Sequence, residues 1–166
     1  YQAKRFSKGT LREFDPKIYQ KAAVDTEKRQ EFQQLIREEL VRYHFQPIIS
    51  GKTGETVAYE ALMRVSLPMI RNPEEVMQLA REENCLHEIE RLTIFKSAEA
   101  YLFLAREGLV SEKARLFVNS IASQHMTEEE SREYIRRFSS IQERIVVEIT
   151  EEEGLDMASM EAKRNM

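Results

Sequence analysis

The sequence predicts an α/β fold in which parallel strands are joined by helical crossovers. Short apolar runs suited to strands, at residues 57–64, 116–119 and 145–150, alternate with longer segments whose apolar residues recur at helical spacing. Parallel strands need long connections, and the segments between these runs are long enough to contain helices. A chain of 166 residues is also long enough to bury a sizeable core.

The N-terminal part predicts a linker, a helix and a hairpin. Residues 1–25 show little apolar periodicity and indicate the end of a helix followed by a linker. Residues 26–43 predict an amphipathic helix, because their apolar positions recur between charged neighbours. Residues 44–50 and 55–64 then predict two strands joined by a turn at residues 51–54.

Two helices are predicted before the next strand. Asn72 followed by Pro73 is typical of a helix start, with a side-chain cap and a proline in the first turn, and this helix is expected to reach about residue 83. A longer helix is predicted at residues 87–107, ending at Gly108, which suits the left-handed conformation after a helix. Tyr101, Phe103 and Leu104 are expected to pack this helix against the sheet.

The C-terminal part repeats the alternation. Residues 116–119 predict a strand, and Thr127 and Glu130 have the spacing of a capping box at the start of a further helix. Residues 144–151 predict the next strand, and a last helix is expected from Leu155 onward.

Composition excludes several functional classes. A net charge of -4 argues against a general nucleic-acid binder, so no direct DNA binding is expected. No apolar stretch approaches the roughly 20 residues that cross a bilayer, and the single cysteine, Cys85, cannot form an internal disulfide. We therefore expect a cytoplasmic protein. The chain starts at Tyr1 without an initiator methionine, which indicates a longer parent that could carry membrane segments elsewhere.

Three strand runs each contain one oxygen-bearing polar residue: Glu60, Asn119 and Glu148. An unpaired carboxylate is costly to bury, and a shared divalent cation would satisfy both glutamates. Two carboxylates and an amide oxygen suit Mg²⁺, Mn²⁺ or Ca²⁺ better than zinc. The alternative is structural: a strand glutamate is often a rim residue, and an asparagine at a strand end often forms a turn.

Alternation along a strand places Glu60, Leu62 and Arg64 on one face. Glu60 and Arg64 are separated by about 13 Å along the strand, which is too far for a direct ion pair. This spacing suits a ligand of some length that contacts both residues. Because ligands gather at the carboxyl ends of parallel strands, Asn119 and Glu148 are consistent with the same site.

Four sequence blocks, in this order, resemble the EAL domain family: residues 45–49 (Phe-Gln-Pro-Ile-Ile), 59–64 (Tyr-Glu-Ala-Leu-Met-Arg), 116–119 (Leu-Phe-Val-Asn) and 147–151 (Val-Glu-Ile-Thr-Glu). The family hydrolyses the bacterial second messenger cyclic di-GMP to the linear dinucleotide pGpG. The resemblance implies a truncated EAL domain at residues 26–166. The start of the chain is similar to the last helix of a GGDEF diguanylate cyclase domain, which implies that residues 1–25 are its tail and a linker.

The resemblance also implies residue roles. Glu60, Asn119 and Glu148 match the family's ligands for catalytic Mg²⁺ or Mn²⁺, and Glu151 matches a supporting acid. The residues that match contacts of the cyclic dinucleotide are Gln46, Leu62 and Arg64, with the arginine near a phosphate. The implied reaction uses divalent cations to activate water, and a planar guanidinium to hold a phosphate oxygen.

The resemblance implies a TIM-like (β/α)₈ barrel with one antiparallel strand, of which this chain supplies about the first half. A complete barrel needs about 250 residues. An open half barrel exposes strand edges, so we expect a homo-oligomer, or a partner that completes the barrel.

The chain departs from the family in two places. It ends at Met166, before the family's Asp-Asp-Phe-Gly segment, its lysine and further metal ligands, so we expect negligible hydrolysis by this fragment, which could also be free of metal. Residues 65–70 lack the tryptophan and glycine often found there in the family. The alternative function is a degenerate, non-catalytic domain that acts as a cyclic di-GMP receptor or a protein-interaction module.

Overall fold

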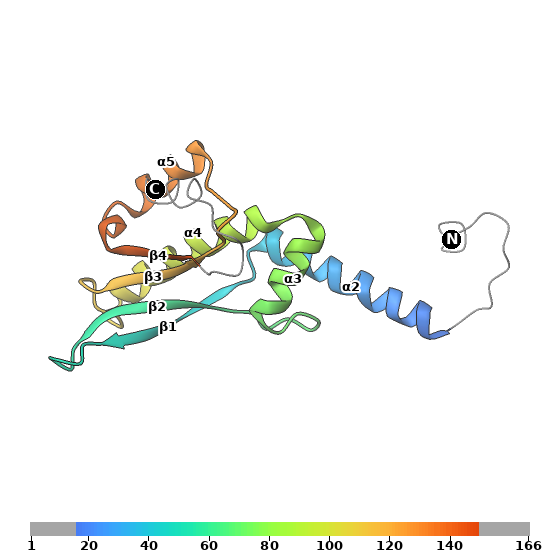
Figure 1. Cartoon of the computed structure of the whole chain (residues 1–166), viewed down its shortest axis with the longest axis horizontal. Helices are drawn as coiled ribbons and strands as arrows, with labels where there is room; N and C mark the ends of the chain where they lie inside the picture. The colour runs from blue at the N-terminus through green and yellow to red at the C-terminus, as the bar shows by residue number, and fades with distance from the viewer. Residues whose placement is uncertain (1–15, 150–166) are drawn as a thin grey trace.

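The computed structural model describes residues 16–149 and contains a sheet of four strands in the order β1-β2-β3-β4 (Figure 1). The strands are β1 (Arg42–Ile49), β2 (Thr56–Arg64), β3 (Arg115–Ser120) and β4 (Ile145–Ile149). The first pair is antiparallel and the other two pairs are parallel. The predicted α/β class and the single antiparallel strand are therefore confirmed.

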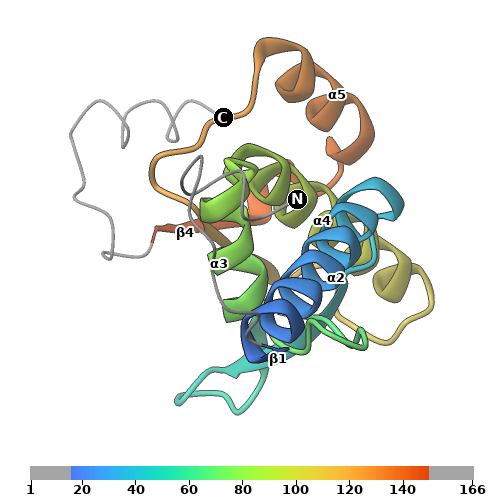
Figure 2. The ribbon, with the colours of Figure 1, turned by 90° about the vertical axis from the view of Figure 1, so that its right-hand side faces the viewer.

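Four α-helices accompany this sheet within residues 16–149: α2 (Pro16–Glu38), α3 (Pro73–Glu83), α4 (Leu86–Arg106) and α5 (Glu128–Phe138). Helices α2, α3 and α4 contact one another, as Figure 2 shows, and α4 packs against β1 and β3. The connections from β2 to β3 and from β3 to β4 both contain helices, as parallel strand pairs require.

Helices α3 and α5 begin where the sequence predicts. The side chain of Asn72 accepts a hydrogen bond from the backbone N–H of Glu75 at 2.9 Å, and Pro73 opens α3. Thr127 and Glu130 form the reciprocal capping box at the start of α5, in which each side chain accepts from the backbone N–H of the other residue. Side chains here satisfy backbone N–H groups that the helix itself cannot.

The first described helix differs from the prediction. It begins at Pro16, inside the segment interpreted as a linker, and ends at Glu38 instead of residue 43. Proline is suited to the first turn of a helix, and Pro16 is the first helical residue that the structure describes. At the other end, Glu39 has a left-handed φ of 53°, and the chain enters β1 at Arg42, two residues before the predicted strand.

The hydrophobic core lies between α4 and the sheet. Leu116 and Val118 of β3 and Tyr101 of α4 are buried, as the strand and helix patterns indicate. Phe103 is 61% exposed, so the prediction that it packs against the sheet is wrong. Residues two positions apart lie on different sides of a helix, so Phe103 cannot share the buried side with Tyr101.

The remaining predictions at the C-terminal end are tested only in part. The strand predicted at residues 144–151 begins at Ile145, because Arg144 closes a short 3₁₀ helix, Gln142–Arg144. Thr150, Glu151 and the helix expected from Leu155 lie outside the described residues. None of the helices within residues 16–149 is both long enough and apolar enough to cross a membrane.

Candidate functional site

The sheet brings Glu60, Asn119 and Glu148 onto one face. Asn119 pairs in register with Glu148 of the neighbouring parallel strand, and Glu60 pairs with Phe117, two residues before Asn119. Residues paired in register point to the same face, and so do residues two positions apart in a strand. Asn119 therefore lies between the two glutamates, on the middle strand of the three.

A contact links two members of this group. Nδ2 of Asn119 lies 3.4 Å from Oε1 of Glu60, a long hydrogen bond that leaves the Asn119 amide oxygen available as an acceptor. Both side chains are half-buried, as is Glu148. Within the described residues, no group of three His, Cys, Asp or Glu side chains is placed to hold a metal ion. A cation held at this place would therefore need the asparagine oxygen as well as the carboxylates.

The predicted ligand-contacting residues lie on this same face. Gln46 of β1 is the cross-strand partner of Glu60, and Leu62 and Arg64 follow Glu60 at intervals of two along β2. All six described site residues predicted from the sequence thus share one face of the sheet. The seventh, Glu151, lies outside the described residues.

Arg64 has a neighbour that the sequence analysis missed. Arg42 is its direct cross-strand partner, and both side chains are exposed at the carboxyl end of β2. The guanidinium of Arg64 donates from Nη1 to the carbonyl oxygen of Met63 at 2.8 Å. Like charges directly opposite one another are unfavourable in a sheet, and an anion between them would relieve the repulsion. The register shift between Ile48 and Ile49 sets this pairing, and no sequence signal marks the shift.

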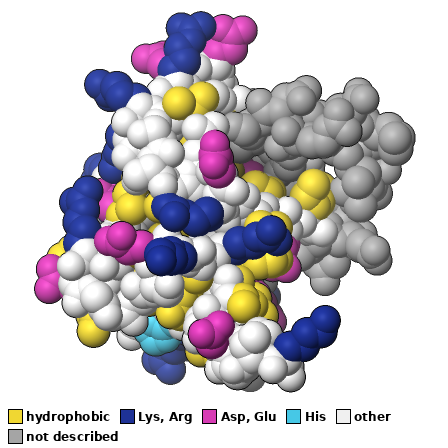
Figure 3. Space-filling view, turned by 90° about the vertical axis from the view of Figure 1, so that its left-hand side faces the viewer, with side chains coloured by type: hydrophobic (Ala, Val, Ile, Leu, Met, Phe, Trp, Pro, Cys, Tyr) yellow, Lys and Arg dark blue, Asp and Glu magenta, His cyan; other side chains and the backbone are white. Residues whose placement is uncertain are grey.

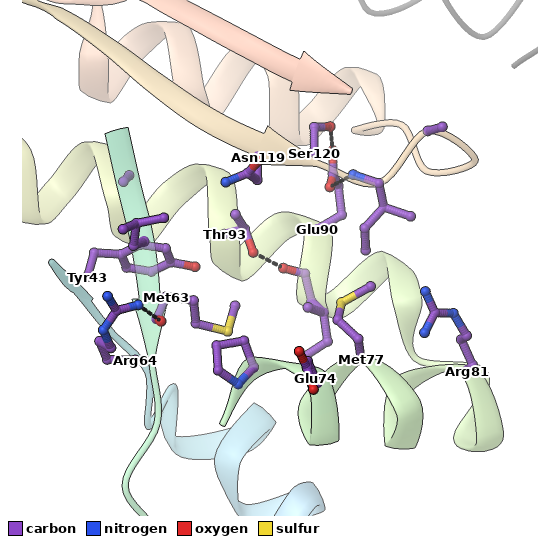
Figure 4. A pocket seen from close by; sticks show the side chains of 16 residues that line it. Tyr43, Met63, Arg64, Glu74, Met77, Arg81, Glu90, Thr93, Asn119 and Ser120 are labelled. Carbon is purple, nitrogen blue, oxygen red and sulfur yellow. Dashed lines mark hydrogen bonds between the residues drawn. The ribbon is translucent and has the colours of Figure 1, made fainter. Parts of the chain in front are cut away.

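A cavity of about 390 Å³ opens beside the carboxyl ends of β2 and β3. Its walls come from the ends of these strands, from β1, and from α3 and α4 (Figure 4). Arg64 and Asn119 reach it from the sheet, whereas Glu74 of α3 and Glu90 of α4 reach it from the helices. The cavity therefore adjoins the predicted site at the end of the sheet where ligands of α/β folds bind.

The loop that follows β2 is tied to α2. Oε2 of Glu31 accepts hydrogen bonds from the backbone N–H groups of Met69, at 2.9 Å, and Ile70, at 2.8 Å. Ile70 is fully buried, which fixes the loop from the other side. The segment that departs from the EAL pattern at residues 65–70 is thus held by defined contacts in this chain.

Glu90 is a second residue that the sequence analysis missed. It is 1% exposed, and its carboxylate accepts hydrogen bonds from the Ser120 hydroxyl and from the backbone N–H of Ile121. These are the two residues that follow Asn119 in the chain. The helical spacing of the sequence could have identified Glu90, since it lies with Ile94 and Tyr101 on the buried side of α4. A lone acid on the buried side of a helix indicates a specific partner.

Figure 3 shows acidic, basic and hydrophobic side chains interspersed on one face of the molecule, without a continuous basic patch on that face.

Burial raises the pKa of the Cys85 thiol, and the neighbouring Glu88 raises it further. A raised pKa disfavours the reactive thiolate, so Cys85 fits the role of a packing residue.

Residues 29–166 match the family model described as the EAL domain. The chain therefore belongs to the EAL domain family. No curated protein matches the chain.

Solved structures of the family share this fold. The crystal structure of the FimX EAL domain of Xanthomonas citri in complex with c-diGMP has a TM-score of 0.60 and 18% identity, covering 80% of this chain and 52% of that chain. The PaMucR phosphodiesterase in complex with c-di-GMP has a TM-score of 0.62 and 19% identity, covering 81% and 56%. An EAL domain protein of Listeria monocytogenes has a TM-score of 0.59 and 18% identity, covering 81% and 53%.

These likenesses define the fold as part of a TIM-like barrel of the EAL type. The chain spans about half the length of the solved relatives that it matches. The four described strands correspond to an incomplete barrel, as the sequence predicts.

Proposed function

We propose that this chain is part of a cyclic di-GMP phosphodiesterase that hydrolyses cyclic di-GMP to pGpG with Mg²⁺ or Mn²⁺. The observation that carries the proposal is the convergence of Glu60, Asn119 and Glu148 on one face of the sheet, where Asn119 and Glu148 lie near the carboxyl ends of parallel strands. Family membership and the cyclic di-GMP named in the structures of two relatives support the same conclusion.

The residues present suit a hard divalent cation. Glu60 and Glu148 would hold it through carboxylate oxygens and Asn119 through its amide oxygen, a donor set typical of Mg²⁺ and Mn²⁺. When bound, such a cation supplies charge stabilisation at phosphate and lowers the pKa of a bound water. The Asn119 amide also lies beside the Glu60 carboxylate, with 3.4 Å between Nδ2 and Oε1. Glu151, outside the described residues, is proposed as a supporting acid.

The remaining residues of this face would bind the dinucleotide. Gln46 and Leu62 contact it from neighbouring strands, while the planar guanidinium of Arg64 holds a phosphate oxygen. Arg42, opposite Arg64, adds positive charge where the phosphate would lie. The cyclic dinucleotide carries two phosphates, so a guanidinium pair at one end of the site fits its charge.

We propose that the 166-residue chain does not hydrolyse cyclic di-GMP by itself, because it spans about half of its solved relatives. β1 and β4 are the edge strands of the described sheet, so we further propose that copies of the chain associate through these edges. Analytical ultracentrifugation tests this, and a sample that stays monomeric at high micromolar concentration contradicts it. Cytoplasmic location and a GGDEF tail at residues 1–25 are parts of the same proposal.

A second candidate is a non-catalytic EAL domain that binds cyclic di-GMP or another protein. The departure of residues 65–70 from the family pattern favours it. Retention of Glu60, Asn119 and Glu148 favours the enzyme, because a receptor has no need to keep metal ligands.

The deciding experiment incubates cyclic di-GMP and Mn²⁺ with the 166-residue chain and, separately, with the longest natural polypeptide that contains it. We expect pGpG from the longer polypeptide alone, and none after Glu60→Gln. A folded, Mn²⁺-loaded longer polypeptide that binds cyclic di-GMP without forming pGpG supports the receptor and contradicts the enzyme. The control Glu55→Gln changes an exposed acid just before the same strand and should leave activity unchanged.

A further inference from the structure

The most deeply buried carboxylate that the structure describes belongs to Glu90 on α4, which is 1% exposed. Burying a carboxylate costs several kcal/mol unless hydrogen bonds replace its lost water. The Ser120 hydroxyl and the backbone N–H of Ile121, at 2.8 Å, both donate to it. Two successive residues at the end of β3 are therefore held to α4 by one side chain.

This tie constrains Asn119. Successive side chains of a strand point to opposite faces, so when Ser120 points toward α4, Asn119 must point toward the other face. That face carries Glu60 and Glu148. The contact between Asn119 and Glu60 is long, at 3.4 Å, and a hydrogen bond of this length is too weak to fix the asparagine alone.

The close-up supports the same connection. In Figure 4, Glu90 extends from α4 toward Ser120 at the end of β3, with dashed lines marking its hydrogen bonds, and Asn119 lies next to Ser120 on the strand. Glu90, Asn119 and Ser120 all line the 390 Å³ cavity. The tie is thus made at the wall of the cavity that adjoins the candidate site.

We propose that Glu90 is a positioning residue for the metal and dinucleotide site: it anchors the carboxyl end of β3 to α4 and thereby holds Asn119 in its orientation between Glu60 and Glu148. The expected effect on metal affinity rests on the proposed function. The effect of Glu90 on the orientation of Asn119 does not depend on that function.

A purely structural role for Glu90 predicts something different. Substitution of Glu90 would then lower the stability of the fold, without an effect on metal binding that depends on Asn119. The two roles are separated by a double-mutant cycle, because two residues that act through one another give non-additive effects.

The variants are Glu90→Gln, Ser120→Ala and Asn119→Ala in the 166-residue chain, with Glu88→Gln as the matched control. Glu88 is an exposed acid on the same helix, two residues from Glu90. Glu90→Gln keeps the size of the side chain but retains only one of the two oxygens that accept from the Ser120 hydroxyl and from the Ile121 N–H. Ser120→Ala removes the hydrogen bond from the Ser120 hydroxyl and leaves that from the Ile121 N–H, so it serves if Glu90→Gln fails to fold.

The first readout is the side-chain amide pair of Asn119 in ¹⁵N-edited NMR spectra, identified by its loss in Asn119→Ala. It requires neither metal nor ligand. We expect these signals to move in Glu90→Gln and, less, in Ser120→Ala, and to stay in place in Glu88→Gln. Unchanged Asn119 signals in a folded Glu90→Gln or Ser120→Ala variant would overturn the proposal.

The second readout is the affinity for Mn²⁺ alone, measured by the EPR signal of the free ion. Loss of a residue that orients a metal ligand typically weakens binding by about 10–100-fold, and we expect a loss of about tenfold for Glu90→Gln. In the Asn119→Ala background the same substitution should have no further effect, whereas an equal loss in both backgrounds contradicts positioning. If the unsubstituted chain binds no Mn²⁺, the proposed function fails, and the NMR signals still decide the positioning proposal.

Discussion

Asn119 and Glu60 are 59 residues apart in the sequence, yet Nδ2 of the asparagine lies 3.4 Å from Oε1 of the glutamate. The parallel pairing of β2 with β3 brings them together across a connection that contains both α3 and α4. Sites of α/β folds are built from such pairs of distant segments on adjacent strands, and Asn119 lies near the carboxyl end of β3, where ligands of these folds bind.

Arg64→Lys should weaken binding of cyclic di-GMP by about tenfold, close to 1.4 kcal/mol, because an ammonium cannot hold a phosphate through two parallel N–H donors. Arg64 is exposed, so thermal stability should not change. Titration with a fluorescent derivative of the dinucleotide measures the effect. The control is Arg115→Lys, at the exposed amino end of β3. Equal affinities of both variants would show that Arg64 makes no phosphate contact.

Thr127→Ala should destabilise the chain by about 1 kcal/mol, since it removes the side-chain cap of α5. Urea unfolding followed by circular dichroism measures the change. Ser139→Ala, at the exposed C-cap of the same helix, should change stability by less than about 0.5 kcal/mol. Similar losses for the two variants would contradict the capping box.

Tyr101→Phe should cost about 1–3 kcal/mol, because it removes the donor to two carbonyl acceptors, and the one of Ala114 is buried. The Tyr101 hydroxyl donates to the carbonyl oxygens of Ser111, at 2.7 Å, and Ala114, at 3.1 Å. Tyr59→Phe is the matched comparison, since the half-buried Tyr59 hydroxyl only accepts a 3.3 Å bond from the Ser111 N–H. Chemical denaturation should rank Tyr101→Phe as the more damaging change, and the reverse ranking would contradict this network.

Acid should weaken the fold partly through Glu130. Burial raises the pKa of Glu130, but hydrogen bonds from Thr127 and His87 outweigh burial and hold the pKa below its ordinary value. A lowered folded pKa stabilises the protein above the unfolded value of about 4.3, and this contribution disappears as the pH falls through the folded value.

Glu130→Gln should therefore lower the unfolding free energy at pH 6–7 and lose that difference near pH 3. Unfolding curves at several pH values measure the two profiles. Profiles that stay parallel down to the acid limit would contradict a role for the ionised Glu130. Glu128→Gln, an exposed acid in the same turn, is the control.

Local signals made much of the fold predictable. Asn72, Pro73 and the capping box of Thr127 and Glu130 fix helix starts within a few residues of sequence, and the structure confirms them. Alternation along β2 placed Glu60 and Arg64 on one face without any knowledge of the partner strands. Local capping and strand periodicity do not depend on distant contacts, which explains this success.

The missed features depend on long-range contacts or on the phase of a helix. Arg42 faces Arg64 only through the hairpin register, and Glu90 meets Ser120 only after α4 packs on β3. Phe103 was misplaced because its apolar character was considered without its angular position on α4. The helical conformation of residues 16–25 was missed because this segment lacks apolar periodicity.

We propose that Glu60, Asn119 and Glu148 share one divalent cation. Paramagnetic NMR of the 166-residue chain tests this proposal most directly, because Mn²⁺ broadens signals near its binding site even when it binds weakly. We predict that the side-chain amide signals of Asn119 broaden first as Mn²⁺ is added, and that Glu60→Gln or Glu148→Gln prevents this while Glu55→Gln does not. Asn119 signals that stay sharp while those near exposed acids broaden would contradict the claim.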